Sequence, residues 1–219
     1  MAETGKSFLI DTTKCTACRA CQVACKQWNG LSAEAEVPVN RGTYENPPDL
    51  SVTQWVLVHF NEAERDDGTL AWNFLRNSCR HCIDAPCKQE ADSADSITID
   101  EATGAVLFGA GTASENFEKI LKACPWNIPR KDSTGQMYKC VMCYDRANNG
   151  ELPACAKVCP AGAIQFGDRQ DILDAADARL SEIRDDFPDA AILDRDDVRL
   201  LILLGDRESM YKTQIERTA

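Results

Sequence analysis

Residues 15–26, CTACRACQVACK, place four cysteines close together along the chain. These residues, Cys15, Cys18, Cys21 and Cys25, are separated by two, two and three positions. Thiols spaced in this way cannot all serve core packing or disulfides, whereas a Cys-x2-Cys-x2-Cys loop can wrap three thiolates around one corner of a 4Fe-4S cluster. The proline that usually follows the fourth cysteine is replaced by Lys26. Proline is not a ligand, so this replacement removes no coordination.

The other eight cysteines fall into groups that repeat this design. In two-cluster ferredoxins the fourth cysteine of each run ligates the other cluster. Applied to the first and last groups, this crossing rule predicts two clusters in one nested module. The first is held by Cys15, Cys18, Cys21 and Cys159, and the second by Cys25, Cys140, Cys143 and Cys155.

The middle of the chain carries a reduced copy of the same module. Ala91 stands where the fourth cysteine of the second group is expected, and no cysteine triplet precedes Cys124. Both losses remove ligands of the same cluster. The remaining thiols predict a third 4Fe-4S cluster held by Cys79, Cys82, Cys87 and Cys124, so that all twelve cysteines are used.

Three other uses of the cysteines compete with this interpretation. Zinc is possible at the Cys-x2-Cys pairs, although zinc ribbons combine two such pairs rather than triplets followed by a fourth cysteine. The even number of cysteines permits disulfides, but closely spaced runs in a chain without an export signal do not favour them. Ordinary buried thiols would explain one or two cysteines, but not twelve cysteines at repeated spacings.

Composition restricts the remaining possibilities. The net charge of −11, from 35 acidic and 24 basic residues, disfavours nucleic-acid binding and would attract a basic partner, although it also serves solubility alone. We expect no membrane-spanning segment, because the longest apolar run, residues 200–204, is far shorter than the ~18 residues required. The N-terminus lacks the charged and apolar regions of a secretory signal.

The hydrophobic pattern predicts an α+β fold of two nested ferredoxin-like, two-cluster modules with a C-terminal helix and strand extension. We expect strands at residues 6–11, 54–60, 70–76, 162–166 and 198–204, a hairpin at 96–108, and helices at 20–28, 115–124 and 168–187. Ser114 is the expected N-cap of the helix at 115–124. Residues 30–51 are expected to form a surface excursion. The predicted domains are 1–53 with 131–167, an insertion at 54–130, and an extension at 168–219.

The two histidines give weaker signals. His81 lies inside the second cysteine loop and is expected to tune a cluster by hydrogen bonding, whereas His59 lies in a strand pattern and is expected to be structural. The sequence contains no Ser/His/Asp set, phosphate loop or GxGxxG motif. Four-thiolate iron has no open position, so we expect electron transfer and no catalytic residue in this chain.

The cysteine groups, with ACPWNIPRK, NPPDL and DDVR, resemble the iron–sulfur subunits of the molybdopterin oxidoreductase family. The greatest similarity is to the small subunits of soluble tungsten or molybdenum formate dehydrogenases of sulfate-reducing bacteria. The resemblance implies a heterodimer with a large catalytic subunit that holds a Mo or W bis-pterin site and oxidises formate or reduces CO2. It also implies periplasmic export by that partner's signal, and electron delivery to an acceptor such as a cytochrome c. Family members with a membrane partner usually carry a fourth cluster and an anchor helix, both of which this sequence lacks.

Two other functions remain open at this point. The same relay can serve another catalytic subunit, such as a polysulfide, thiosulfate or dimethyl sulfoxide reductase. Alternatively, the chain is a free polyferredoxin carrier, although the extension after residue 167 and the excursion at 30–51 exceed what a carrier needs. A cytoplasmic location is the alternative to the periplasm.

Overall fold

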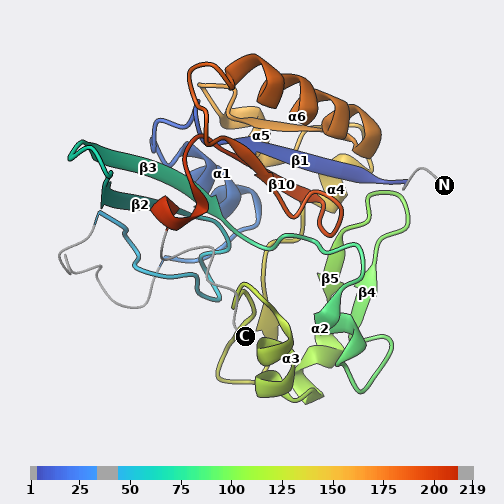
Figure 1. The fold of residues 1–219 in the computed structure, drawn as a ribbon. Coiled ribbons are helices and arrows are strands. Elements are labelled where there is room, and N and C mark those ends of the chain that lie inside the picture. The colour runs from blue at the N-terminus through green and yellow to red at the C-terminus, as the bar shows by residue number, and fades with distance from the viewer. Residues whose placement is uncertain (1–3, 34–43, 212–219) are drawn as a thin grey trace.

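The computed structural model describes residues 4–33 and 44–211 (Figure 1). The expected surface excursion at 30–51 therefore lies partly outside the described residues. The strands are β1 (Lys6–Asp11), β2 (Leu57–Glu64), β3 (Leu70–Asn77), β4 (Ile97–Ile99), β5 (Val106–Phe108), β6 (Arg130–Lys131), β7 (Met137–Tyr138), β8 (Ile164–Asp168), β9 (Ala191–Leu193) and β10 (Leu200–Leu204). The helices are α1 (Ala20–Trp28), α2 (Pro86–Gln89), α3 (Phe117–Ala123), α4 (Tyr144–Ala147), α5 (Ala154–Val158) and α6 (Arg169–Ile183), with 3-10 turns at Ala110–Ser114 and Glu208–Tyr211.

A four-stranded sheet joins the two ends of the chain in the order β8-β1-β10-β9. Strand β1 pairs antiparallel with β8 on one side and parallel with β10 on the other. Successive side chains of a strand point to opposite faces of the sheet. Leu9, Leu201 and Leu203 accordingly pack with α6 on one face. Figure 1 shows α6 lying along this face of β1 and β10.

The opposite face of the sheet carries the core that surrounds the cysteines. Phe8, Ile10 and Ile202 pack there together with Cys21 and Cys25 and with side chains of the β2–β3 hairpin. Helices α1 and α5 pack against each other beside this core. The alternating pattern of β1 and β10 therefore separates a structural layer, covered by α6, from a layer that contains thiols.

The β4–β5 hairpin, α2 and α3 form a separate lobe (Figure 1). Its core consists of apolar side chains that include Ile97, Val106, Ile120 and Met137. Gly104 precedes β5 with φ +75°, and a Cβ atom at this position would lie 2.1 Å from Nε of Arg199. A residue with a side chain would be strained by the positive φ and would also have to displace this guanidinium group.

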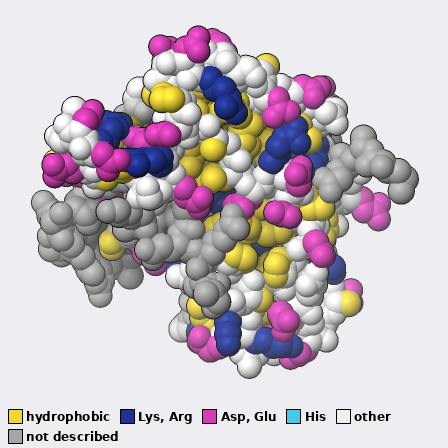
Figure 2. All heavy atoms as spheres, viewed as in Figure 1, with side chains coloured by type: hydrophobic (Ala, Val, Ile, Leu, Met, Phe, Trp, Pro, Cys, Tyr) yellow, Lys and Arg dark blue, Asp and Glu magenta, His cyan; other side chains and the backbone are white. Residues whose placement is uncertain are grey.

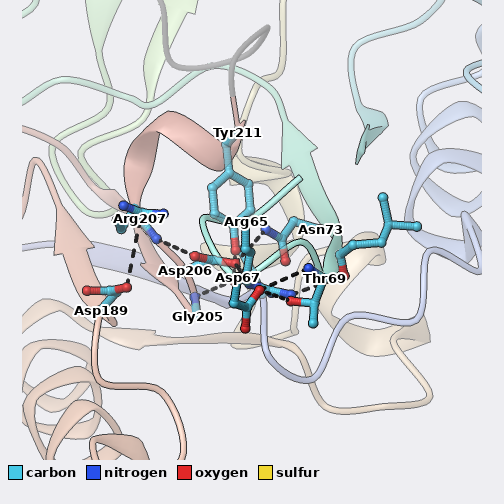
Figure 3. Close-up of polar contacts among 11 residues, drawn as sticks. Arg65, Asp67, Thr69, Asn73, Asp189, Gly205, Asp206, Arg207 and Tyr211 are labelled. Atoms are coloured by element: carbon cyan, nitrogen blue, oxygen red, sulfur yellow. Dashed lines mark hydrogen bonds and ion pairs between the residues drawn. The ribbon is translucent and has the colours of Figure 1, made fainter. Parts of the chain in front are cut away.

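Polar contacts fasten the β2–β3 hairpin to the segment after β10 (Figure 3). Asp206 accepts hydrogen bonds from Nη2 of Arg65 at 2.7 Å and from Nδ2 of Asn73 at 3.3 Å. Although partial burial opposes it, these bonds hold the pKa of Asp206 below its ordinary value. Tyr211 follows in the same segment, and its hydroxyl lies 3.0 Å from the hydroxyl of Thr12.

The structure agrees with the predicted α+β class and corrects one detail of the helix at 115–124. That helix begins at Phe117, and its N-cap is Asn116, whose side chain accepts a hydrogen bond from the backbone amide of Lys119. Ser114 instead ends the preceding 3-10 turn, so its prediction as the N-cap was wrong. Within the described part of the chain, no helix is both long enough and apolar enough to span a bilayer.

Candidate metal centres

Three loops of the pattern Cys-x2-Cys share an unusual backbone conformation. The residue before the second cysteine of each loop has a positive φ: +52° at Ala17, +50° at His81 and +61° at Met142. Non-glycine residues in this region cost of order 1–3 kcal/mol, and such strain concentrates at functional sites. At two of the loops the turn points a backbone amide at sulfur. The amides of His81 and Met142 donate to Sγ of Cys79 and of Cys140, each at 3.4 Å.

One predicted ligand set lines a single cavity. We call it the Cys79 group, and it consists of Cys79, Cys82, Cys87 and Cys124. The thiols come from the loop after β3, from α2 and from the residue that caps α3. The backbone amide of Ile128 donates to Sγ of Cys124 at 3.5 Å. The other walls are largely apolar and include Pro86, Val106 and Trp126.

A second predicted set lines another cavity. This Cys15 group consists of Cys15, Cys18, Cys21 and Cys159. Cys159 follows α5 directly, so the fourth thiol comes from the opposite end of the sequence, as the crossing rule requires. Ile10, Val58 and Ile164 form apolar walls. Cys18 is exposed, which places this group at the molecular surface.

The third predicted set, the Cys25 group, is buried between the other two. It consists of Cys25, Cys140, Cys143 and Cys155, all of which are buried. Burial raises the pKa of Cys25 well above its ordinary value, and the negative charges of the other three cysteines raise it further. This mutual effect requires the four thiols to be neighbours. The packing of α1 on α5 brings Cys25 to Cys155, and the loop before α4 adds the other two.

The thiols of each group fit the ligand set of a 4Fe-4S cluster, which takes four thiolates. Burial raises the pKa of Cys21, Cys87 and Cys143 to about 12, so these thiols become thiolates only when bound metal compensates the charge. Among residues 4–33 and 44–211, no three His, Cys, Asp or Glu side chains are placed to hold a single metal ion. Four sulfurs around one zinc would lie only about 3.8 Å apart. None of the twelve cysteines forms a disulfide.

Comparison with known proteins agrees with this chemistry. The sequence model of a family described as a 4Fe-4S dicluster domain matches residues 70–169. The formate dehydrogenase subunit beta of Megalodesulfovibrio gigas is 46% identical over 210 residues, which cover 94% of this chain and 96% of that protein. The chain belongs to the iron–sulfur (beta) subunits of formate dehydrogenases. Both the predicted family and the predicted ferredoxin-like fold are therefore confirmed.

Two further relatives show how the family varies in length. The formate dehydrogenase 2 subunit beta (cytochrome c-553) of Nitratidesulfovibrio vulgaris is 42% identical, over 94% of this chain and 96% of that protein. The nitrate-inducible formate dehydrogenase iron–sulfur subunit of Escherichia coli is 40% identical, over 80% of this chain but only 58% of its own length. As a member of this family, the chain is a non-catalytic electron-transfer subunit of an oxidoreductase that carries iron–sulfur clusters.

Buried cations lie beside the thiols of this beta subunit, and the sequence analysis missed them. Arg76, Arg80 and Lys139 are all nearly inaccessible to water. The ammonium group of Lys139 donates to the backbone carbonyls of Val106 and Cys140. Arg80 lies over the ring of Trp126, 6.0 Å from its centroid. The signal was present in the sequence, because a basic residue directly follows Cys79 and another directly precedes Cys140.

The structure places both histidines in the core. Nδ1 of His81 accepts a hydrogen bond from the backbone amide of Val106 at 3.1 Å, and the backbone amide of His81 donates to Sγ of Cys79. Nε2 of His81 has no hydrogen-bond partner among the described residues, and the tuning of a cluster by His81 stays a prediction. His59 is buried in β2, and burial, followed by the charge of Arg80, lowers its pKa to about 3. Its imidazole is neutral, so its 3.7 Å approach to Glu45 is not an ion pair.

Apolar packing occupies the lobe where two-cluster ferredoxins would hold another cluster. Ala91, which replaces the expected fourth cysteine, packs against the core that contains Ile97, Ile120 and Met137. Cys82 and Cys87 border the same core. The substitutions that remove ligands are thus accompanied by side chains that fill the volume.

An acidic hollow lies next to the Cys79 group. This hollow and the cavity of the group share four wall residues, Cys82, Pro86, Pro125 and Trp126. Its acidic members are Asp84, Asp194, Asp196 and Asp197. Elsewhere, acidic side chains are spread over the face shown in Figure 2, with basic side chains among them. The hollow therefore combines negative charge with a short path to the thiols.

Proposed function

We propose that this chain holds three 4Fe-4S clusters, one in each of the Cys15, Cys25 and Cys79 groups, and that it relays electrons between a catalytic subunit and an external acceptor. The observation that carries the proposal is that four thiols from distant segments line one apolar cavity in each of two groups. Twelve cysteines in three sets of four leave no thiol unused.

The electrostatic contacts among the thiols support a linear order with the Cys25 group in the middle. Cys155 raises the pKa of Cys21 in the Cys15 group, after burial as the larger cause. Cys79 similarly raises the pKa of Cys140 in the Cys25 group. These two contacts connect the middle group to each of its neighbours. We propose that electrons enter at the Cys15 group and leave at the Cys79 group.

The chain's own residues would tune this relay more than they would react in it. When bound, a 4Fe-4S cluster accepts and releases single electrons, at a potential set by charge, hydrogen bonds and burial around its sulfurs. Here the backbone amides of His81, Ile128 and Met142 donate to cysteine sulfurs. The apolar walls exclude water, and the buried cations favour the state with the added electron.

The proposed partner is a large catalytic subunit in a heterodimer, holding a Mo or W bis-pterin that oxidises formate or reduces CO2. This proposal is supported by the relatives reported above, all of which are named as formate dehydrogenase subunits. We further propose a periplasmic location reached with that partner. The division into a two-cluster module (1–53 with 131–167), a one-cluster insertion (54–130) and an extension (168–219) also stays a proposal.

The proposed acceptor is a basic protein such as a cytochrome c. The relative from Nitratidesulfovibrio vulgaris carries cytochrome c-553 in its name. The acidic hollow offers charge complementarity to such a partner and shares its wall with the Cys79 group. Docking at this hollow would bring the acceptor close to the proposed exit.

Anaerobic purification of the chain with its large subunit tests the proposal. We expect a brown complex that contains Mo or W and reduces a viologen dye when formate is added. A complex loaded with clusters but inactive with formate would refute the proposed substrate and keep the relay. A colourless complex without iron would refute the relay itself.

A further inference from the structure

Arg76 is buried between two of the proposed cluster sites although it belongs to neither ligand set. It lies near the end of β3, and only 2% of its surface is exposed. Its side chain lines the cavity of the Cys15 group. Its Nη2 atom also lies 3.5 Å from Sγ of Cys155 in the Cys25 group. One guanidinium group thus contacts both sites.

The surroundings of Arg76 supply little negative charge apart from the thiols. Nη1 donates to the hydroxyl of Ser78 at 2.8 Å, and Nε has no hydrogen-bond partner among the described residues. The centre of the guanidinium lies 5.6 Å from the ring centroid of Phe8. No carboxylate in the described part of the chain forms an ion pair with Arg76.

An uncompensated guanidinium is unfavourable in this position. Arginine stays protonated in proteins, and burying an unpaired charge costs several kcal/mol even after relaxation. Arg80, another buried arginine near the thiols, differs because the negative charge of Asp194 acts on it. Clusters with four thiolate ligands carry negative charge, which would compensate the guanidinium of Arg76.

We propose that Arg76 is the shared counter-charge of the clusters in the Cys15 and Cys25 groups and raises the reduction potentials of both. The inference rests on the proposed function, because it requires clusters at these two groups. Reduction adds one electron, supplied by the catalytic partner, and therefore one negative charge, with no bond formed or broken. A fixed positive charge stabilises this reduced state. The Cys79 group lies outside the contacts of Arg76.

The test compares Arg76→Gln, which removes the charge, with Arg76→Lys, which keeps it. Reductive titration of the purified complex, followed by electron paramagnetic resonance, gives the midpoint potential of each cluster. For Arg76→Gln we expect the midpoint potential of the Cys25 cluster to fall by at least about 59 mV, which corresponds to a tenfold smaller equilibrium constant for one-electron reduction. We expect a smaller shift at the Cys15 cluster and none at the Cys79 cluster, while Arg76→Lys stays near the wild type.

A control separates electrostatics from general damage to the fold. Arg169 is also buried, and it bonds to Ser7 and to the carbonyls of Val198 and Arg195, outside the walls of both cysteine-lined cavities. Arg169→Gln should therefore leave all three potentials unchanged. The inference would be overturned if the potentials were unchanged in Arg76→Gln, or if all three clusters shifted equally in that variant. It would also be overturned if Arg76→Lys shifted the potentials as much as Arg76→Gln.

The outcome remains decisive if the glutamine variant assembles poorly. Loss of clusters from Arg76→Gln but not from Arg76→Lys supports the role of the charge, whereas loss from both variants overturns it. Failure of the proposed function is distinguishable, because the wild-type complex would then lack reducible clusters at these groups.

Discussion

Exchanging Cys25 and Cys159 for alanine, one at a time, tests the crossing of ligands between the ends of the chain. Cys25 lies four residues after Cys21 in sequence, yet the structure places it with Cys140, Cys143 and Cys155. Cys159 lies four residues after Cys155, yet it lines the cavity with Cys15. Each substitution should therefore remove the cluster whose other ligands lie at the opposite end of the sequence.

The magnitude follows from the four ligands that each cluster requires. Either variant should lower the iron held by this chain from about twelve atoms to about eight. The total iron content alone does not reveal which cluster was lost. The two losses differ in position, because Cys25→Ala should remove the middle cluster of the linear order and Cys159→Ala a terminal one.

Electron paramagnetic resonance of the fully reduced complex distinguishes the two losses. Magnetic coupling between reduced clusters falls steeply with distance. We expect Cys25→Ala to leave two separated clusters with narrow, weakly coupled signals, and Cys159→Ala to leave adjacent clusters whose signals stay broadened by coupling. The opposite pattern, or loss of both clusters from each variant, would refute the crossed pairing.

Three further predictions concern charge and stability. The double variant Asp196→Asn with Asp197→Asn should slow electron transfer to a basic cytochrome severalfold at low salt. The control, Asp185→Asn with Asp186→Asn, removes equal charge elsewhere and should not slow it. Stopped-flow rates that are the same in both double variants would contradict the docking site. Because the pKa of His59 is lowered to about 3, the unfolded chain binds a proton below pH ~6.5 that the native chain does not bind, and the free energy of unfolding of the wild type falls as the pH falls. In His59→Gln this fall should be smaller, by up to about 1.4 kcal/mol per pH unit. Urea titrations that show the same change in unfolding free energy between pH 6.5 and 5.5 for both proteins would contradict this. Asp206→Asn should lower the unfolding free energy by about 1–3 kcal/mol because it weakens the hydrogen bonds to Arg65 and Asn73. The control Asp189→Asn, at a half-exposed position, should change the unfolding free energy by less than about 1 kcal/mol. Equal melting temperatures of the two variants would contradict this prediction.

Local elements of the fold were predictable because each has a short-range cause. The expected strand at 6–11 and helix at 20–28 match β1 and α1. The expected helix at 168–187 corresponds to α6, whose Ile172 and Ala176 are buried against the sheet. The error at Ser114 has a local cause as well, since Asn116 offers a competing side chain two residues later.

Long-range pairing could not be predicted in the same way. The apolar run at 200–204 predicts a buried strand, but nothing in it specifies parallel pairing with β1, from Phe8 with Leu200 to Asp11 with Leu203. The buried positions of Arg76 and Arg80 were missed for a related reason. Charged residues are mostly exposed, so burial of an arginine follows only from the three-dimensional arrangement of the thiols around it.

The candidate ligand sets were predictable from spacing because the crossing rule converts sequence order into spatial pairs. The structure brings each predicted set together, and it adds what spacing cannot contain: the left-handed residue in each loop, the amides that point at sulfur and the apolar core beside Ala91. Spacing identifies ligands, whereas the surrounding residues determine how those ligands would be tuned.

Anomalous diffraction at the iron absorption edge, from crystals of the chain with its catalytic partner, would locate the iron atoms themselves. We predict three compact iron sites within this chain, one bounded by each of the Cys15, Cys25 and Cys79 groups. An iron site bounded by a different set of cysteines, or single zinc ions in place of the iron sites, would contradict it.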